Sequence, residues 1–203
     1  MKYIINCCLL GYLIGSISPS AFISKVKRTN LKEQGTGNLG ASNVLLVFGK
    51  IYGVIVMIFD IVKAIVAVKL AEYLFPTLSI AGILAGNAAV FGHVFPFYLK
   101  FKGGKGLATF GGFILASDPL LFCILLIISG TLMLIANYSA AMPMSASFLF
   151  PILYGLKKWS FISAISVLPA SILVIVKHFS NLEKGKRGED IKIRQFIKNG
   201  LNK

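Results

Sequence analysis

The stretch IYGVIVMIFDIVKAIVAVKLAEYLF, residues 51–75, decides the fold class. Only four of its side chains are charged, namely Asp60, Lys63, Lys69 and Glu72. An α-helix needs about 20 predominantly apolar residues to cross the hydrocarbon core of a bilayer. The stretch is therefore predicted to form a transmembrane helix.

Further apolar runs lie on both sides of this stretch. They cover about residues 3–22, 78–97, 107–116, 120–136, 140–156 and 161–176. We therefore expect an all-α integral membrane protein with seven transmembrane helices. Residues 1–203 are expected to form a single polytopic domain, with a short basic tail from about residue 177.

Composition supports a membrane protein. The 203 residues are 56% hydrophobic and only 14% charged, against roughly 25% charged residues in soluble domains. Mean hydropathy is +0.81, which excludes the disordered class. The formal net charge is nevertheless +14. The three cysteines have neither metal-ligand spacing nor a disulfide framework, so no metal or cofactor is expected.

The positive charge indicates sidedness. The segments 25–50, 98–105 and 177–203 hold 16 of the 21 Lys and Arg residues. Cytoplasmic loops of membrane proteins carry an excess of these residues. We therefore expect the N-terminus outside the cell and the C-terminus in the cytoplasm. If the short run 107–116 does not cross the membrane, the number of crossings becomes even and the C-terminal tail lies on the other side.

The first basic loop reads KEQGTGNLGASNV, residues 32–44. Residues 35–40 match G-x-G-x-x-G in form, but a dinucleotide site needs a preceding strand and a βαβ unit. Glycines such as Gly37 let a backbone approach a ligand closely. Hydroxyl and amide groups come from Thr36, Asn38, Ser42 and Asn43. A flexible connector is the alternative.

The second basic loop reads GHVFPFYLKFKGGKG, residues 92–106. Lys105 follows Gly103 and Gly104 and precedes a helix expected to begin near Leu107. Glycine amides, a lysine and a helix N-terminus together favour phosphate binding. The alternative is a basic loop that touches lipid headgroups. His93 is as consistent with packing as with ligand binding.

Two more polar groups interrupt the apolar runs. Asp60 and Lys63 lie three residues apart and share one helix face. Charges in hydrocarbon are costly, so they mark either a site or a mutual ion pair. His178 and Asn181 share a helix face at the cytoplasmic end of the last run.

Four segments together resemble one known family. GTGNLGASNV at 35–44, FDIVKA at 59–64, GHVFPFYLKFKGGKG at 92–106 and KHFSN at 177–181 are similar to bacterial acyl-phosphate:glycerol-3-phosphate acyltransferases. The resemblance implies a multi-pass protein of the bacterial cytoplasmic membrane. It implies transfer of an acyl chain from acyl phosphate to the 1-hydroxyl of glycerol 3-phosphate. The partners would be these two substrates and membrane lipids, with no nucleic acid.

The resemblance also implies roles for individual residues. Lys105, His178 and Asn181 would be catalytic. Substrates would be bound by Thr36, Gly37, Asn38, Ser42, Asn43, Asp60, Lys63, Gly103 and Gly104.

Four positions depart from the family pattern. The position of the family's first-loop serine holds Thr36, and that of its arginine after N-V-L holds Leu46. The family's later serines fall at Ala140 and Pro143, and a one-residue shift would bring Ser139 into the first of these positions. These departures motivate one alternative, a catalytically weakened paralogue that binds phospholipid precursors. A transporter for an anionic metabolite is the other alternative. It would place its broken helices near the membrane midplane.

Overall fold

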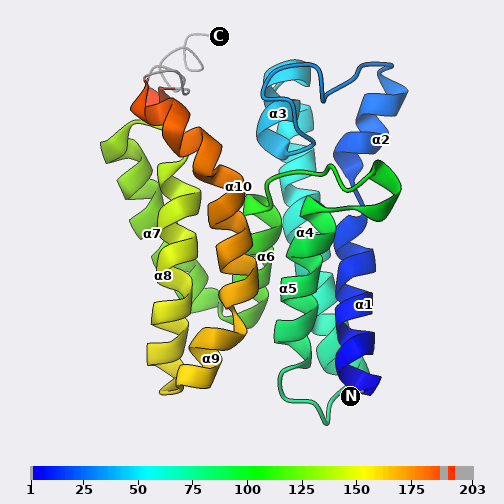
Figure 1. Ribbon diagram of the computed structural model, residues 1–203, viewed down its shortest axis with the longest axis vertical. Coiled ribbons are helices and arrows are strands. Elements are labelled where there is room, and N and C mark those ends of the chain that lie inside the picture. Colours follow the sequence, from blue (N-terminus) through cyan, green and yellow to red (C-terminus); the bar gives the residue numbers. More distant parts are fainter. Residues whose placement is uncertain (1, 188–191, 195–203) are drawn as a thin grey trace. The chain divides into compact units, whose positions relative to one another are not determined.

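The computed structural model describes residues 2–187 and 192–194, and within these ranges the regular structure is helical (Figure 1). The chain divides into two compact units, Met1–Asp118 and Pro119–Lys203. Unit 1 contains α1 Lys2–Ser16, α2 Pro19–Val26, α3 Ala41–Phe48, α4 Lys50–Leu74, α5 Ala81–Val94, the 3-10 turn η1 Phe97–Leu99 and α6 Leu107–Ser117. Unit 2 contains α7 Pro119–Ala136, α8 Ala141–Lys158, α9 Phe161–Ser166 and α10 Leu168–Lys186.

In unit 1, helices α1, α4 and α5 pack against one another. The closest approach is between α1 and α5, where Gly11 and Gly15 face the backbone of Ala85 and Ala89. A Cβ atom on either glycine would collide with that backbone. Small residues spaced four apart allow helices to pack this closely in a membrane, which explains why this apolar sequence forms a tight pair.

The first apolar run is broken rather than continuous. Helix α1 ends at Ser16 and α2 begins at Pro19, whose ring cannot supply a helical N–H. The Ser18 side chain caps α2 by accepting a hydrogen bond from the Ala21 N–H at 3.3 Å. The sequence predicted one helix over residues 3–22, and this prediction was wrong. The break leaves backbone N–H and C=O groups near residue 17 without partners in a helix.

The first basic segment is also more structured than expected. Residues 25–50 were predicted to be a loop, but α2 continues to Val26 and α3 occupies Ala41–Phe48. Leu31 and Leu39 are buried with Val44 and Val56 in one apolar cluster. This cluster packs the segment 31–44 against α4. Buried residues therefore hold both ends of the glycine-rich loop in place.

In unit 2, α8 packs against α7, α9 and α10. The last apolar run is divided into α9 and α10 around Val167, two residues before Pro169. Helix α10 extends to Lys186, so the tail expected from residue 177 begins as helix. Its residues 188–191 and 195–203 lie outside the described part of the chain.

Among the described helices, four are long and apolar enough to cross a membrane. They are Lys2–Val26, with the break described above, Lys50–Leu74, Ala81–Leu99 and Pro119–Ala136. Helix α6 is apolar but has only 11 residues. The prediction for residues 51–75 is confirmed almost to the residue by α4, and the short run 107–116 is confirmed as a helix by α6.

Candidate functional site

The first glycine-rich loop is held in shape by one buried side chain. Asn43, in the first turn of α3, has no solvent exposure. Its Oδ1 accepts from the Thr36 N–H at 2.6 Å, and its Nδ2 donates to the carbonyls of Leu31 and Asn38, both at 2.8 Å. Gly35 lies against this amide in the left-handed region, where a Cβ would collide with Asn43 Oδ1. Asn43 therefore organises the loop from beneath.

The outer surface of the same loop carries polar groups. Asn38 Nδ2 donates to Thr36 Oγ1 at 2.8 Å, and Asn38 Oδ1 accepts from the Gly40 N–H at 2.9 Å. Thr36, Gly37 and Ser42 are exposed, whereas Asn38 is half-buried. Hydroxyl and amide groups are thus displayed on a loop whose backbone is fixed.

The second glycine-rich loop folds back onto the end of α5. The Gly103 N–H donates to the Val94 carbonyl at 3.0 Å, and the Gly104 N–H donates to the His93 carbonyl at 3.2 Å. These carbonyls belong to the last turn of α5, where no intrahelical donor remains. Lys105 follows at once, half-buried, two residues before α6 begins.

The two predicted loops meet within unit 1. The Leu39 N–H donates to the Gly103 carbonyl at 3.4 Å, and Lys32 Nζ donates to the Leu99 carbonyl, also at 3.4 Å. Segments separated by more than sixty residues are therefore joined. The two joined loops form one surface, on which Thr36, Gly37 and Ser42 are exposed and Asn38 and Lys105 are half-buried.

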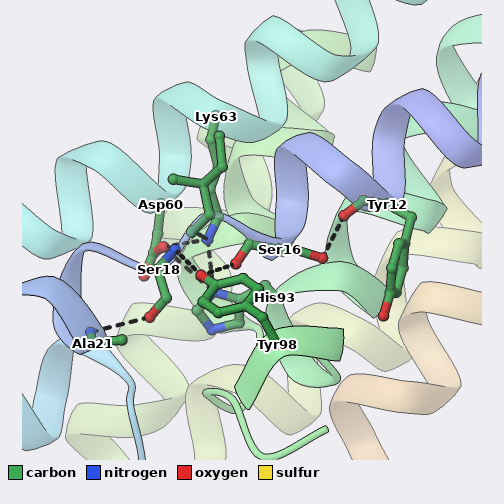
Figure 2. Close-up of polar contacts among 9 residues, drawn as sticks. Tyr12, Ser16, Ser18, Ala21, Asp60, Lys63, His93 and Tyr98 are labelled. Carbon is green, nitrogen blue, oxygen red and sulfur yellow. Dashed lines mark hydrogen bonds and ion pairs between the residues drawn. The ribbon is translucent and has the colours of Figure 1, made fainter. Parts of the chain in front are cut away.

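Asp60 and Lys63 lie below this surface and are not part of it. Lys63 Nζ is 2.6 Å from Asp60 Oδ1, which confirms that the two share one helix face. Both side chains are buried, with relative exposures of 1% and 3%. Lys63 Nζ also contacts His93 Nδ1 at 3.0 Å and donates to the Ile17 carbonyl at 2.8 Å (Figure 2). The predicted substrate-binding pair is enclosed by protein atoms.

The remaining predicted residues belong to unit 2. His178 and Asn181 lie on α10, and His178 Nδ1 is 2.9 Å from the Val174 carbonyl one turn earlier. Their expected common helix position is confirmed. Ala140 and Pro143 lie at the start of α8 and are buried.

Most of the chain matches one known protein family. The family model described as glycerol-3-phosphate acyltransferase matches residues 5–188. The chain belongs to this family. The matched region contains the positions of the predicted site residues Lys105, Asn38, Asn43, His178 and Asn181.

Similar proteins cover nearly the whole chain. The glycerol-3-phosphate acyltransferase of Exiguobacterium sibiricum is 35% identical, over 98% of this chain and 97% of its own length. That of Enterococcus faecalis is 30% identical, with both chains fully covered. The crystal structure of PlsY, an integral membrane glycerol 3-phosphate acyltransferase, in its glycerol 3-phosphate form has a TM-score of 0.86 at 27% identity, covering 94% of this chain and 95% of its own. Its lysophosphatidic acid form has a TM-score of 0.82 at 27% identity, covering 93% and 94%.

Two residues of this region, His93 and Tyr98, were not assigned a role from the sequence. His93 was open between packing and ligand binding, and it proves to be buried beside Lys63. Tyr98 was missed: its hydroxyl donates to the Ser16 carbonyl at 2.8 Å and accepts from the Ser18 N–H at 3.1 Å. Both partners lie at the break between α1 and α2. A helix-breaking Pro19 inside an apolar run was the signal that such partners were needed.

Proposed function

We propose that the chain transfers an acyl group from an acyl phosphate to the 1-hydroxyl of glycerol 3-phosphate. The products are lysophosphatidic acid and inorganic phosphate, and the pathway served is phospholipid synthesis. Family membership supports this reaction class. The observation that carries the proposal is the meeting of the two glycine-rich loops within one unit, where the Leu39 N–H donates to the Gly103 carbonyl at 3.4 Å.

In the proposed reaction the 1-hydroxyl oxygen attacks the acyl carbonyl carbon. A C–O bond forms, the bond from the carbonyl carbon to the phosphate oxygen breaks, and phosphate leaves with that electron pair. The hydroxyl proton passes to phosphate or water. Because an acyl phosphate is already activated, holding both substrates in reacting geometry accounts for much of the acceleration.

Each predicted residue has a part in this scheme. Lys105 holds the phosphate and stabilises the charge that develops on it. Gly103 and Gly104 have a supporting role, because their N–H groups donate to the Val94 and His93 carbonyls and so fix the loop that carries Lys105. The first loop fixes the acyl phosphate through Thr36 and Asn38, assisted by Gly37 and Ser42. His178 and Asn181 orient glycerol 3-phosphate. We give Asn43, Asp60 and Lys63 a supporting role, because their polar atoms are used by protein partners.

We further propose that the chain acts as one domain with seven transmembrane helices in the bacterial cytoplasmic membrane. The N-terminus lies outside, and the loops 25–50 and 98–105 face the cytoplasm. The concentration of 16 of the 21 cationic residues in three segments supports this orientation. Cysteine labelling from either side of sealed vesicles tests it.

The activity is tested with the purified protein in detergent. Acyl phosphate and glycerol 3-phosphate are added, and phosphate release and lysophosphatidic acid are measured together. Lys105→Ala is expected to lower kcat by about 100-fold or more, as loss of one charge-stabilising donor does in other acyl transfers. Lys102→Ala, an exposed lysine of the same loop, is the matched control. A folded Lys105→Ala protein with wild-type turnover contradicts the assignment.

A catalytically weakened paralogue is the second candidate. Leu46 replaces a family cation and is 41% exposed on α3, so this position offers no charge to a phosphate. Native turnover in the same assay contradicts this alternative. Glycerol phosphate flux into sealed vesicles without acylation would instead favour a transporter.

A further inference from the structure

A buried cluster of three ionisable side chains lies beneath the glycine loop in unit 1. We define it as Asp60, Lys63 and His93, which come from α4 and the end of α5. Their side chains are exposed by 1%, 3% and 6%. Figure 2 shows the three converging beside the break between α1 and α2. A charged pair buried this deeply in a membrane helix is costly unless its partners are well placed.

Three polar protein atoms lie within 3.0 Å of the Lys63 ammonium group. An ammonium has three N–H donors. Three acceptors surround Nζ: Asp60 Oδ1 at 2.6 Å, the Ile17 carbonyl at 2.8 Å and His93 Nδ1 at 3.0 Å. Lys63 thereby joins α4, the break after α1 and the end of α5.

This arrangement selects one form of His93. Since Lys63 donates to Nδ1, that nitrogen carries the lone pair, and the proton of the neutral ring lies on Nε2. A proton on Nδ1 would instead face the ammonium, and its alternative acceptor, Asp60 Oδ1, is farther away at 3.3 Å. The cluster therefore presents Nε2–H on the far side of the ring.

The far side of the ring touches the glycine loop. A Cβ atom on Gly104 would collide with His93 Nε2, and one on Gly103 would collide with the His93 carbonyl. The Gly104 N–H also donates to that carbonyl. The height of the loop above α5 is thus set by the imidazole of His93 and by the backbone of the same residue.

We propose that Asp60, Lys63 and His93 are positioning residues, and that Lys63 locks His93 as the Nε2–H tautomer on which Gly103 and Gly104 rest. The inference rests on the proposed function, because the loop it positions is the one assigned to hold the acyl phosphate. It predicts that the cluster controls binding of this substrate without touching it.

The tautomer is tested first, because this readout is independent of activity. The chain has only two histidines, so a His178→Gln protein labelled with 15N-histidine reports His93 alone. We expect a neutral ring with the lone pair on Nδ1. In Lys63→Met the population of this tautomer should fall. A proton on Nδ1, or an imidazolium with both nitrogens protonated, overturns the proposal.

The positioning role is tested by kinetics. Lys63→Met is compared with Lys69→Met, which changes the other lysine of an i,i+3 pair on α4. We expect Lys63→Met to raise KM for acyl phosphate by about 10- to 100-fold, the cost of a small misplacement near a reacting centre. KM for glycerol 3-phosphate and kcat at saturation should change little. Lys69→Met should match the wild type.

The outcomes separate this inference from the proposed function. A fall in kcat with both KM values unchanged indicates loss of folded enzyme, and it overturns the positioning role. Wild-type protein without any acyl transfer overturns the proposed function, while the 15N spectrum still decides the tautomer. If Lys63→Met cannot be purified, the 15N spectrum of the His178→Gln protein alone decides which nitrogen of His93 carries the proton.

Discussion

Helix α4 carries the same chemical pair twice. Asp60 and Lys63 are three residues apart at 2.6 Å, and Lys69 and Glu72 are three residues apart at 2.8 Å. The first pair is 1% and 3% exposed, whereas the second is 57% exposed at Lys69 and 46% exposed at Glu72. Identical spacing therefore places one pair inside the helix packing and leaves the other at the surface.

The difference shows what helical spacing decides and what it does not. Spacing brings opposite charges together on one face. Burial decides how much their separation costs, because a charge without its partner inside protein or lipid cannot be solvated. The buried pair also has further partners, because Lys63 contacts His93 and donates to the Ile17 carbonyl. Substitutions in the buried pair should therefore lower the stability of the protein more than substitutions in the surface pair.

The largest effect is expected from breaking the buried pair. Asp60→Asn leaves the Lys63 ammonium enclosed without a counter-charge, so it should destabilise the protein by about 3–5 kcal/mol. Equilibrium unfolding in mixed detergent micelles, followed by far-UV circular dichroism, measures this loss.

The control for this prediction is the double variant Asp60→Asn/Lys63→Met. It removes both charges, so it should be more stable than the sum of the two single changes predicts. Strict additivity of the two single effects would mean that the pair is not coupled, and it would remove the contrast with Lys69 and Glu72.

A second comparison sets buried Asn43 against exposed Asn30. Asn43→Ala leaves the Thr36 N–H and the Leu31 and Asn38 carbonyls without their partner. Loss of buried hydrogen-bond partners should cost about 1–3 kcal/mol, and acyl transfer should fall because the first loop loses its shape.

Asn30 supplies the matched control for that change. Its Nδ2 donates to Glu33 Oε1 at 2.6 Å, but both side chains are exposed. Water can replace the lost bond, so Asn30→Ala should keep wild-type stability and turnover. Equal losses in the two alanine variants, by the same unfolding and phosphate-release assays, would contradict the structural role of Asn43.

The features of the fold and of the site that could be predicted from the sequence are those that depend on residues close together along the chain. Residues 51–75 and 107–116 were predicted as helices from composition and length, and the spacing of Asp60 and Lys63 predicted that they share one helix face. Lys105 was predicted to precede a helix, and α6 begins two residues later. Each of these inferences uses residues that are neighbours along the chain.

The missed features depend on contacts between distant segments. The break between α1 and α2 is stabilised by Tyr98 and Lys63, which lie far along the chain from Ser18. The burial of His93 against Gly104 depends on how the second loop folds back on α5. A single sequence gives residue types and spacing, but these contacts are set by helix packing.

A third comparison uses two glycines. A methyl group on Gly104 would collide with His93 Nε2, whereas one on Gly130 in α7 meets nothing within 4 Å. Gly104→Ala should cost about 1–3 kcal/mol through overpacking and should raise KM for acyl phosphate. Gly130→Ala should leave activity unchanged and be neutral or slightly stabilising, as helical glycine-to-alanine changes are. Wild-type kinetics in Gly104→Ala would show that the loop does not rest on His93.

The smallest effect is expected at the surface pair itself. Lys69→Met removes the 2.8 Å contact with Glu72, but both groups lie near the end of α4 and are about half exposed. A long lysine side chain there can extend toward the interface, and an exposed pair contributes only about 0–1 kcal/mol. The unfolding free energy should therefore change by less than about 1 kcal/mol, with kcat and both KM values at wild-type levels. A loss comparable to that of Asp60→Asn would mean that burial does not separate the two pairs, since both lie on α4 with the same i,i+3 spacing.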